Sequence, residues 1–139
     1  MLRNTIEIPI RFSEVDSLHV VWHGHYVKFF EDGRESFGAQ YGLSYLDIYN
    51  SEGLAVPIVE LQTFYKRPLA YGDSAVIETT FINTPAAKII FDFKIFSKNH
   101  GFLACEGRTV QVFMHPQKQE LFIVNPPFFE SWKRKHGLL

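Results

Sequence analysis

The sequence predicts a single α+β domain over residues 1–139, in which a curved antiparallel sheet wraps around one long α-helix. Three observations support this fold class. The chain has the length of one domain and is short for two. A strand-like alternation precedes one long helical pattern. Four or five strand-like segments then follow with short turns between them, so we expect a meander of consecutive strands that covers the helix.

The first predicted strand covers residues 5–12, with the sequence TIEIPIRF. Its apolar side chains occupy alternate positions, as in a strand that buries one face only. Pro9 interrupts the pattern, and because proline has no backbone N–H to donate, we expect an edge position or a bulge there. A polar stretch over residues 13–17 then leads to the helix.

A long helix is predicted to begin near His23 or Gly24 and to run for about 16 residues, or about 24 Å. Gly42 is expected to end it. Gly33 falls on the apolar face of the helix, where the missing side chain would let a strand approach closely. Apolar residues recur with the helical period at Tyr26, Phe29, Phe30, Phe37 and Tyr41.

After the helix, residues 43–55 are expected to form a loop or a short helical turn, and strands begin after Pro57. In the segment IIFDFKIF, apolar side chains alternate with Asp92 and Lys94, which is typical of an antiparallel strand with one solvated face. The predicted strands cover residues 56–66, 74–83, 88–98 and 102–115.

The sequence near the end of the chain predicts a short strand over residues 121–124 and then a terminal helix. Asn125 is placed to cap this helix, Pro126 falls in its first turn, and Gly137 lies beyond its end.

Composition excludes several classes of function. The net charge is −1, so no basic surface for a nucleic-acid partner is expected. Cys105 is the only cysteine, which excludes an internal disulfide and a thiolate metal cage. The N-terminal segment lacks a signal-like apolar region and no stretch is long and apolar enough to span a bilayer, so we expect a cytoplasmic protein.

The chemistry of the sequence gathers at the entry to the helix, in DSLHVVWHGHYVKFFEDGR. The free N–H groups of a first helical turn can bind a carbonyl oxygen and stabilise the oxyanion formed when that carbonyl is attacked. A nearby acid, here Asp16, can act as a nucleophile or as a general base. The alternative is that Asp16 only satisfies backbone N–H groups in a turn.

Three histidines, His19, His23 and His25, also raise the question of a metal site. Their spacing fits no single regular element, because the first two would need a helix and the last two a strand. We therefore expect no bound metal and no cofactor. The motifs of serine hydrolases, nucleotide-binding loops and zinc proteases are absent from the sequence.

The order of elements and the motif at the helix entry resemble the hotdog-fold acyl-CoA thioesterases, in the branch of 4-hydroxybenzoyl-CoA thioesterase and the YbgC-like proteins. The matching residues in the helix region are Asp16, Val20, Val21, Trp22, His23, Tyr26, Phe30, Glu31 and Arg34. A second motif of the family, in a later turn, is matched by Tyr65, Arg67, Pro68, Gly72 and Asp73. Together the two motifs place the resemblance over roughly residues 5 to 125.

This resemblance implies a hotdog fold that hydrolyses an acyl-CoA thioester to a free acid and CoA. The resemblance implies that Asp16 is the catalytic carboxylate. It also implies that the backbone N–H near His23 polarises the thioester carbonyl. The His23 side chain would orient substrate or water, or would simply complete the helix start. Trp22, Gly24, Tyr26 and Arg67 would contact the substrate. It also implies a homodimer or homotetramer with sites at the interface between subunits.

Two departures from the family pattern affect the site. Many YbgC-like members have a tyrosine where this chain has Phe12, which cannot donate a hydrogen bond. The family prefers glycine where this chain has His19, so His19 must avoid or tolerate a positive φ. Two other functions stay open: a protein that binds acyl thioesters without catalysis, and a hotdog hydratase or dehydratase, although the motifs of the latter are missing.

Overall fold

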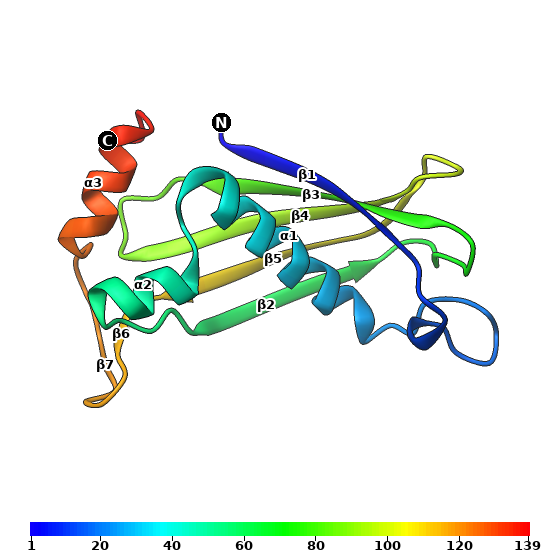
Figure 1. Cartoon of the computed structure of the whole chain (residues 1–139), viewed down its shortest axis with the longest axis horizontal. Helices are drawn as coiled ribbons and strands as arrows, with labels where there is room; N and C mark the ends of the chain where they lie inside the picture. Colours follow the sequence, from blue (N-terminus) through cyan, green and yellow to red (C-terminus); the bar gives the residue numbers. More distant parts are fainter.

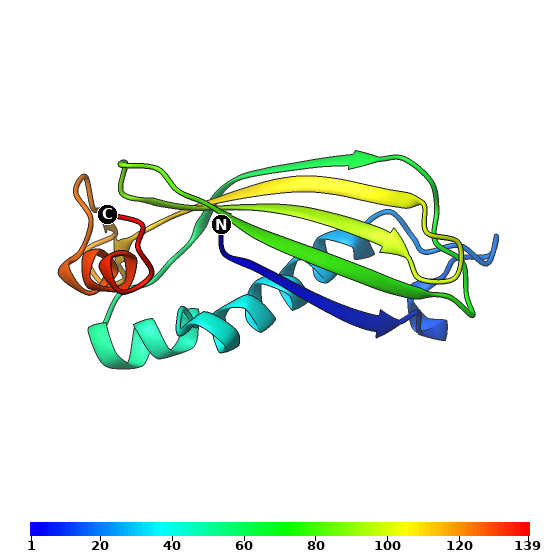
Figure 2. The same ribbon diagram turned by 90° about the horizontal axis from the view of Figure 1, so that it is seen from above.

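The computed structural model describes all 139 residues as a five-stranded antiparallel sheet that curves over one face of a long helix (Figures 1 and 2). The predicted α+β fold is confirmed. The elements are β1 (Arg3–Pro9), a 3-10 turn (Phe12–Glu14), α1 (His25–Tyr41), α2 (Tyr45–Glu52), β2 (Ile58–Tyr65), β3 (Ser74–Ile82), β4 (Lys88–Ser97), β5 (Leu103–Val112), β6 (Met114–His115), β7 (Glu120–Leu121) and α3 (Pro127–Lys135).

The long helix α1 has 17 residues and lies close to its predicted bounds. It ends at Gly42, which adopts the left-handed conformation with φ 73° and donates its N–H to the carbonyl of Gly38. Gly33 is buried against the sheet, as predicted. A Cβ at Gly33 would lie 2.8 Å from Cγ2 of Ile77 and would overlap the hydroxyl of Thr79, so only glycine lets α1 approach β3 this closely.

The order of strands in the sheet is β1-β3-β4-β5-β2. The predicted meander is right for β3, β4 and β5, which pair in sequence order. It is wrong for β2, which pairs with β5 at the far edge instead of with β3. The predicted edge position of Pro9 is confirmed, because β1 forms the other edge of the sheet.

Phenylalanine side chains fill the space between α1 and the sheet. Phe30 stacks on Phe93 of β4 with ring centroids 4.7 Å apart, and Phe37 meets Phe91 at 5.0 Å. Phe30 also covers Gly107 of β5, where a Cβ would lie 2.7 Å from its ring. Cys105 is fully buried in β5 and acts as a small core residue.

The C-terminal region departs from prediction in two places. The last strand is shorter than residues 121–124, because β7 ends at Leu121 and Val124 is exposed. Asn125 does not cap α3, whose N-cap is Pro126. A cap at Asn125 would place Pro127, which has no backbone N–H, at one of the two positions that donate to a cap, and would leave only the N–H of Phe128. Gly137 lies beyond the end of α3, as expected.

The two ends of the molecule differ in character. The loop over residues 10–24 lies at one end of the sheet, and α2, the β6–β7 hairpin and α3 lie at the other (Figure 1). None of the helices is long and apolar enough to cross a lipid bilayer. The start of α1 points to the first of these ends, where the candidate site is found.

Candidate active site

The segment between β1 and α1 folds into a loop that doubles back on itself. A bridge pairs Val15 with Val21, and the N–H of Asp16 donates to the carbonyl of Val20 at 2.9 Å. His19 forms the tip of this turn with φ 63°, so it tolerates the positive φ where glycine was expected. The loop thereby carries Asp16 to the same end of the molecule as the start of α1.

Asp16 is partly exposed and uses one of its two carboxylate oxygens in the turn. Its Oδ1 accepts the N–H of Leu18 at 2.9 Å, whereas Oδ2 accepts no hydrogen bond from the protein. Asp16 therefore satisfies a backbone donor as a turn residue does. It also keeps one oxygen free for chemistry.

The first turn of α1 presents backbone donors that have no acceptor in the protein. They include the N–H groups of His23, Gly24 and Tyr26. The positive end of the helix dipole adds to their attraction for a partly negative oxygen. The ring of Trp22 packs directly over Gly24, where a Cβ would overlap it.

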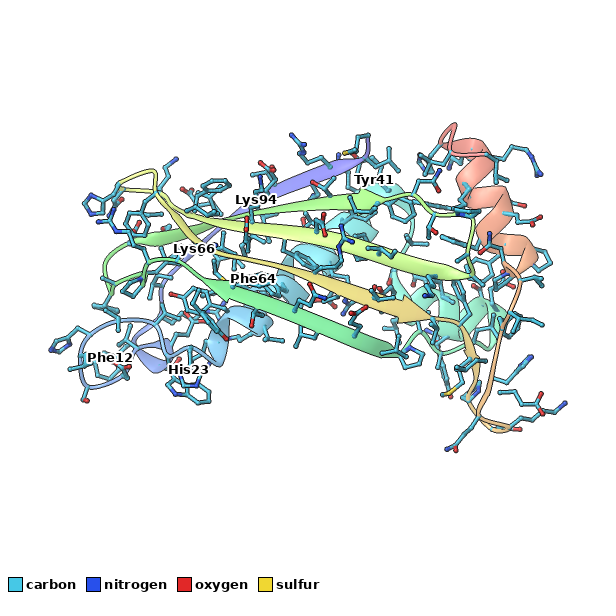
Figure 3. The ribbon with its side chains drawn as sticks, turned by 180° about the vertical axis from the view of Figure 1, so that it is seen from behind. Phe12, His23, Tyr41, Phe64, Lys66 and Lys94 are labelled. Carbon is cyan, nitrogen blue, oxygen red and sulfur yellow. The ribbon has the colours of Figure 1, made fainter.

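A cavity of about 170 Å³ opens beside the start of α1. His23 and Tyr26 line it from the helix side, and Arg67 lines it from the segment after β2. The other residues of its wall are Val21, Tyr65, Lys66, Pro68 and Ala104. In Figure 3 the side chains of His23 and Lys66 lie at this end of the molecule, together with Phe12.

Two tyrosines fix the geometry of this cavity. The hydroxyl of Tyr65 donates to the carbonyl of His23 at 3.0 Å, which ties the end of β2 to the helix start. The hydroxyl of Tyr26 accepts the N–H of Leu69 at 3.0 Å. Burial raises the pKa of Tyr26, so its hydroxyl stays protonated at neutral pH. Tyr26 is thus a rigid part of the cavity wall.

The structure brings together some of the predicted site residues and separates others. His23, Tyr26 and Arg67 share the cavity. Trp22 lies outside it and half-exposed, packed on the imidazoles of His23 and His25 at ring-centroid distances of 4.8 and 5.5 Å. Asp16 stands on the adjoining loop, outside the cavity wall, and no hydrogen bond joins it to His23.

The histidines do not gather around a common point. His23 and His25 pack on Trp22, and His19 occupies the tip of the turn. No group of three or more side chains of the metal-binding types comes together in the structure.

One residue of the site was not recognised from the sequence. Glu14 is only 1% exposed and accepts the N–H of Arg11 at 2.7 Å and the ammonium of Lys28 at 3.0 Å. Burial alone would raise the pKa of Glu14, but these two partners outweigh it and lower the pKa. The carbonyl of Glu14 also accepts the N–H of Trp22. Glu14 therefore fastens the loop that carries Asp16 to α1.

Phe12, which lies with Glu14 in the 3-10 turn, is 77% exposed. Its ring packs edge-on against Tyr71, with ring centroids 6.0 Å apart. It points away from the core and offers an apolar surface where many YbgC-like proteins have a tyrosine hydroxyl.

A match to a protein-family model identifies the family to which this chain belongs. The model of the thioesterase-like superfamily matches residues 10–132, which include the whole site. The chain belongs to this superfamily. The resemblance to the hotdog thioesterases seen in the sequence is thereby confirmed.

Two members of the superfamily illustrate the range of relatives. The chain is 31% identical to the Bacillus subtilis protein YneP, provisionally named an acyl-CoA thioesterase, over 91 residues that cover 66% of this chain and 65% of YneP. It is 29% identical to the chloroplastic acyl-acyl carrier protein thioesterase ATL3 of Arabidopsis thaliana over 109 residues, 78% of this chain and 57% of ATL3. The matches thus span less than two thirds of both relatives.

Solved structures agree on the fold of this thioesterase-like chain. The DHNA-CoA thioesterase of Staphylococcus aureus superposes with a TM-score of 0.86, at 24% identity, over 99% of this chain and 92% of that one. The five-stranded sheet around a central helix is therefore a hotdog fold.

Proposed function

We propose that the protein is an acyl-CoA thioesterase that hydrolyses its substrate to a free acid and CoA. The observation that carries this proposal is the free oxygen of Asp16 on a loop that is fastened to α1 at the same end of the molecule as the unpaired N–H groups of the helix start. An acid and an oxyanion-binding site are sufficient for acyl transfer to water. Membership of the thioesterase-like superfamily and the name of YneP support the same reaction.

In the proposed reaction the thioester carbonyl accepts hydrogen bonds from the N–H groups of His23 or Gly24, which stabilise the negative charge that develops on its oxygen. In one route Asp16 attacks the carbonyl carbon, the C–S bond breaks and CoA leaves as a thiolate that takes up a proton. Water then hydrolyses the mixed anhydride and restores the carboxylate. In the other route Asp16 takes a proton from water as the water attacks. Both routes use no metal and no cofactor.

The remaining side chains have supporting roles in this proposal. The His23 imidazole orients substrate or water at the mouth of the cavity, and Tyr26 forms its fixed wall. The exposed guanidinium of Arg67 meets the CoA portion of the substrate. The ring of Trp22 shields the helix start at Gly24 from one side. Phe12 gives the entrance an apolar surface.

A partner subunit completes this site in the proposal. The edge strand β2 has an unpaired side and exposes a row of apolar residues, namely Ile58, Val59, Leu61, Phe64 and Tyr65. An uncovered apolar edge of this kind favours pairing with another strand. Because Tyr65 and Arg67 also line the cavity, a second copy on β2 would close it. We therefore propose a homodimer through β2, alone or within a homotetramer.

Light scattering tests the assembly directly. We expect the mass of a dimer or tetramer for the wild type and a smaller assembly for Val59→Asp, which places a charge on the exposed edge. Glu60→Asp is the matched control at the neighbouring position. A wild-type monomer at micromolar concentration would contradict the proposed interface.

A second candidate is a protein that binds acyl thioesters without hydrolysing them. The bond from Leu18 to Asp16 favours this alternative, because it is what a turn residue needs and does not depend on catalysis. The two candidates differ in turnover, not in binding.

The experiment that tests the proposed function is a thiol-release assay with the purified chain over a panel of aliphatic and aromatic acyl-CoAs. We expect turnover of at least one class, and the same panel defines the preferred acyl group. Binding of acyl-CoA with no thiol release from any member of the panel would support the binding protein and contradict the enzyme.

A further inference from the structure

Helix α1 is preceded by a tight turn whose middle peptide bond joins His23 to Gly24. The N–H of His25 donates to the carbonyl of Trp22 at 2.9 Å, which closes a β-turn over residues 22–25. Gly24 is the third residue of this turn, and its φ of −68° and ψ of −20° are close to those of a type I turn. The backbone bond fixes the two ends of the turn, whereas its middle peptide has to be held by another group.

A glycine at the third position of the turn makes a second arrangement accessible. In a type II turn the middle peptide is flipped and the third residue has a positive φ, which glycine adopts without steric cost. The flip would reverse the directions of the His23 carbonyl and of the Gly24 N–H. Because the Gly24 N–H is one of the donors proposed to bind the thioester carbonyl, the flipped turn would withdraw it from the site.

The hydroxyl of Tyr65 holds the middle peptide in the observed arrangement. It donates to the carbonyl of His23 at 3.0 Å, and no backbone N–H donates to that carbonyl. The peptide is trans, and in a planar trans peptide the C=O and the N–H point in opposite directions. The bond from Tyr65 on one side of the peptide therefore sets the direction of the Gly24 N–H on the other side, where it has no acceptor in the protein.

The side chain of Tyr65 is itself held in place by its neighbours. Its ring meets that of Tyr26 edge-on at a centroid distance of 5.6 Å, and it meets the imidazole of His23 in the same way at 6.3 Å. Its backbone pairs with Cys105 of β5. The hydroxyl is thus presented to the peptide by a fixed ring. A hydrogen bond accepted by a peptide carbonyl also polarises the peptide and strengthens its N–H as a donor.

We propose that Tyr65 is a positioning residue for the hydrolysis. It locks the His23–Gly24 peptide with its N–H directed at the thioester oxygen, and it makes this N–H a stronger donor to the oxyanion. Tyr65 acts through the peptide and does not itself contact the reacting atoms. The inference rests on the proposed thioesterase function, and it assigns the oxyanion to the N–H of Gly24 among the unpaired donors of the helix start.

Tyr65→Phe tests this role, because it removes the hydroxyl and keeps the ring in the cavity wall. On the best acyl-CoA of the panel we expect kcat to fall about tenfold with KM near that of the wild type, since a donor to the oxyanion acts mainly in the transition state. Tyr49→Phe, at an exposed tyrosine of α2 at the other end of the molecule, is the matched control and should keep the wild-type kcat. A kcat of Tyr65→Phe equal to that of the wild type, or a loss expressed in KM alone, would overturn the proposal.

An NMR measurement on the protein without substrate tests the peptide itself. The sequence contains three His–Gly pairs, at residues 23–24, 100–101 and 136–137, so labelling histidine carbonyls with carbon-13 and glycine with nitrogen-15 selects these three peptides. In Tyr65→Phe we expect the signal of one peptide to move, while the other two stay in place as internal controls. Three unchanged signals would show that Tyr65 does not hold the peptide and would overturn the proposal. A wild type that releases no thiol would instead reject the proposed function, and a moved signal would still show that Tyr65 holds this peptide.

Discussion

The ammonium of Lys28 on α1 lies 3.0 Å from Oε2 of Glu14, a carboxylate that is almost completely buried. This contact joins the first turn of the helix to the loop that carries Asp16. Glu14 also accepts the N–H of Arg11, so the carboxylate holds the loop at two points. This pair thus helps to hold Asp16 in its position relative to the helix start.

Lys28→Met should lower the free energy of unfolding by about 1–3 kcal/mol, because it leaves the carboxylate of Glu14 buried with one donor fewer. The pKa of Glu14 is lowered in the folded protein, so its stabilising effect is present above the unfolded pKa of about 4.5 and is lost as the pH falls through the folded pKa. Loss of Lys28 raises that pKa and moves the acid transition to higher pH. Urea unfolding at several pH values measures both effects. Lys118→Met, at an exposed lysine without an ion pair, is the control, and an equal effect there would contradict this role.

His19→Gly should raise the free energy of unfolding by about 1 kcal/mol, because glycine adopts the observed φ without the steric cost that histidine incurs. The turn keeps its backbone bonds, since these use the N–H and carbonyl of residue 19. Ser17→Gly, whose φ is not positive, should be neutral or destabilising. Thermal unfolding measures the difference in stability. A His19→Gly variant less stable than the wild type would contradict the conclusion that the positive φ of His19 is strained.

Gly33→Ala should destabilise the protein by about 1–3 kcal/mol, although alanine is the better helix former. The added methyl group would press on Ile77 and the hydroxyl of Thr79 and push α1 away from β3. Glu35→Ala, on the exposed side of the same helix, should change stability little. Chemical unfolding compares the two variants, and a stabilised Gly33→Ala would show that the helix and sheet can separate without cost.

Cys105 should resist thiol reagents in the folded protein. Burial raises the pKa of its thiol to about 11, so little thiolate is present at neutral pH, and the side chain is not exposed. Labelling with a chromogenic disulfide reagent at pH 8 should be slow until denaturant is added. Rapid labelling of one thiol per chain in the native state would contradict the buried position.

Local patterns in the sequence were sufficient to predict the elements but not all of their pairing. The helix period and Gly42 located α1, and alternation located the strands. The placement of β2 is not predictable in this way, because the stretch from Pro68 to Asp73 has the composition of a short turn between two paired strands. In the structure this stretch pairs with the loop before α1: the N–H of Val21 donates to the carbonyl of Leu69, and that of Tyr71 to the carbonyl of His19. Such contacts between distant segments leave no local periodicity.

The candidate site was predictable where chemistry and position coincide in sequence, as for Asp16 and the start of α1. Glu14 was missed because it lies in a polar stretch, where an acid is normally exposed. Its partner Lys28 lies on another element, so only the folded chain shows that the acid is buried and paired.

The most direct measurement is kcat for the wild type and Asp16→Asn on the best acyl-CoA of the panel, with Asp47→Asn as the control at an exposed acid of α2. Asparagine keeps the size of the side chain and can still accept the N–H of Leu18, but it cannot attack the thioester or take a proton from water. We predict that kcat falls at least about a hundredfold in Asp16→Asn, with stability and KM near those of the wild type, while Asp47→Asn remains fully active. A kcat of Asp16→Asn equal to that of the wild type would contradict the assignment of Asp16 as the catalytic carboxylate.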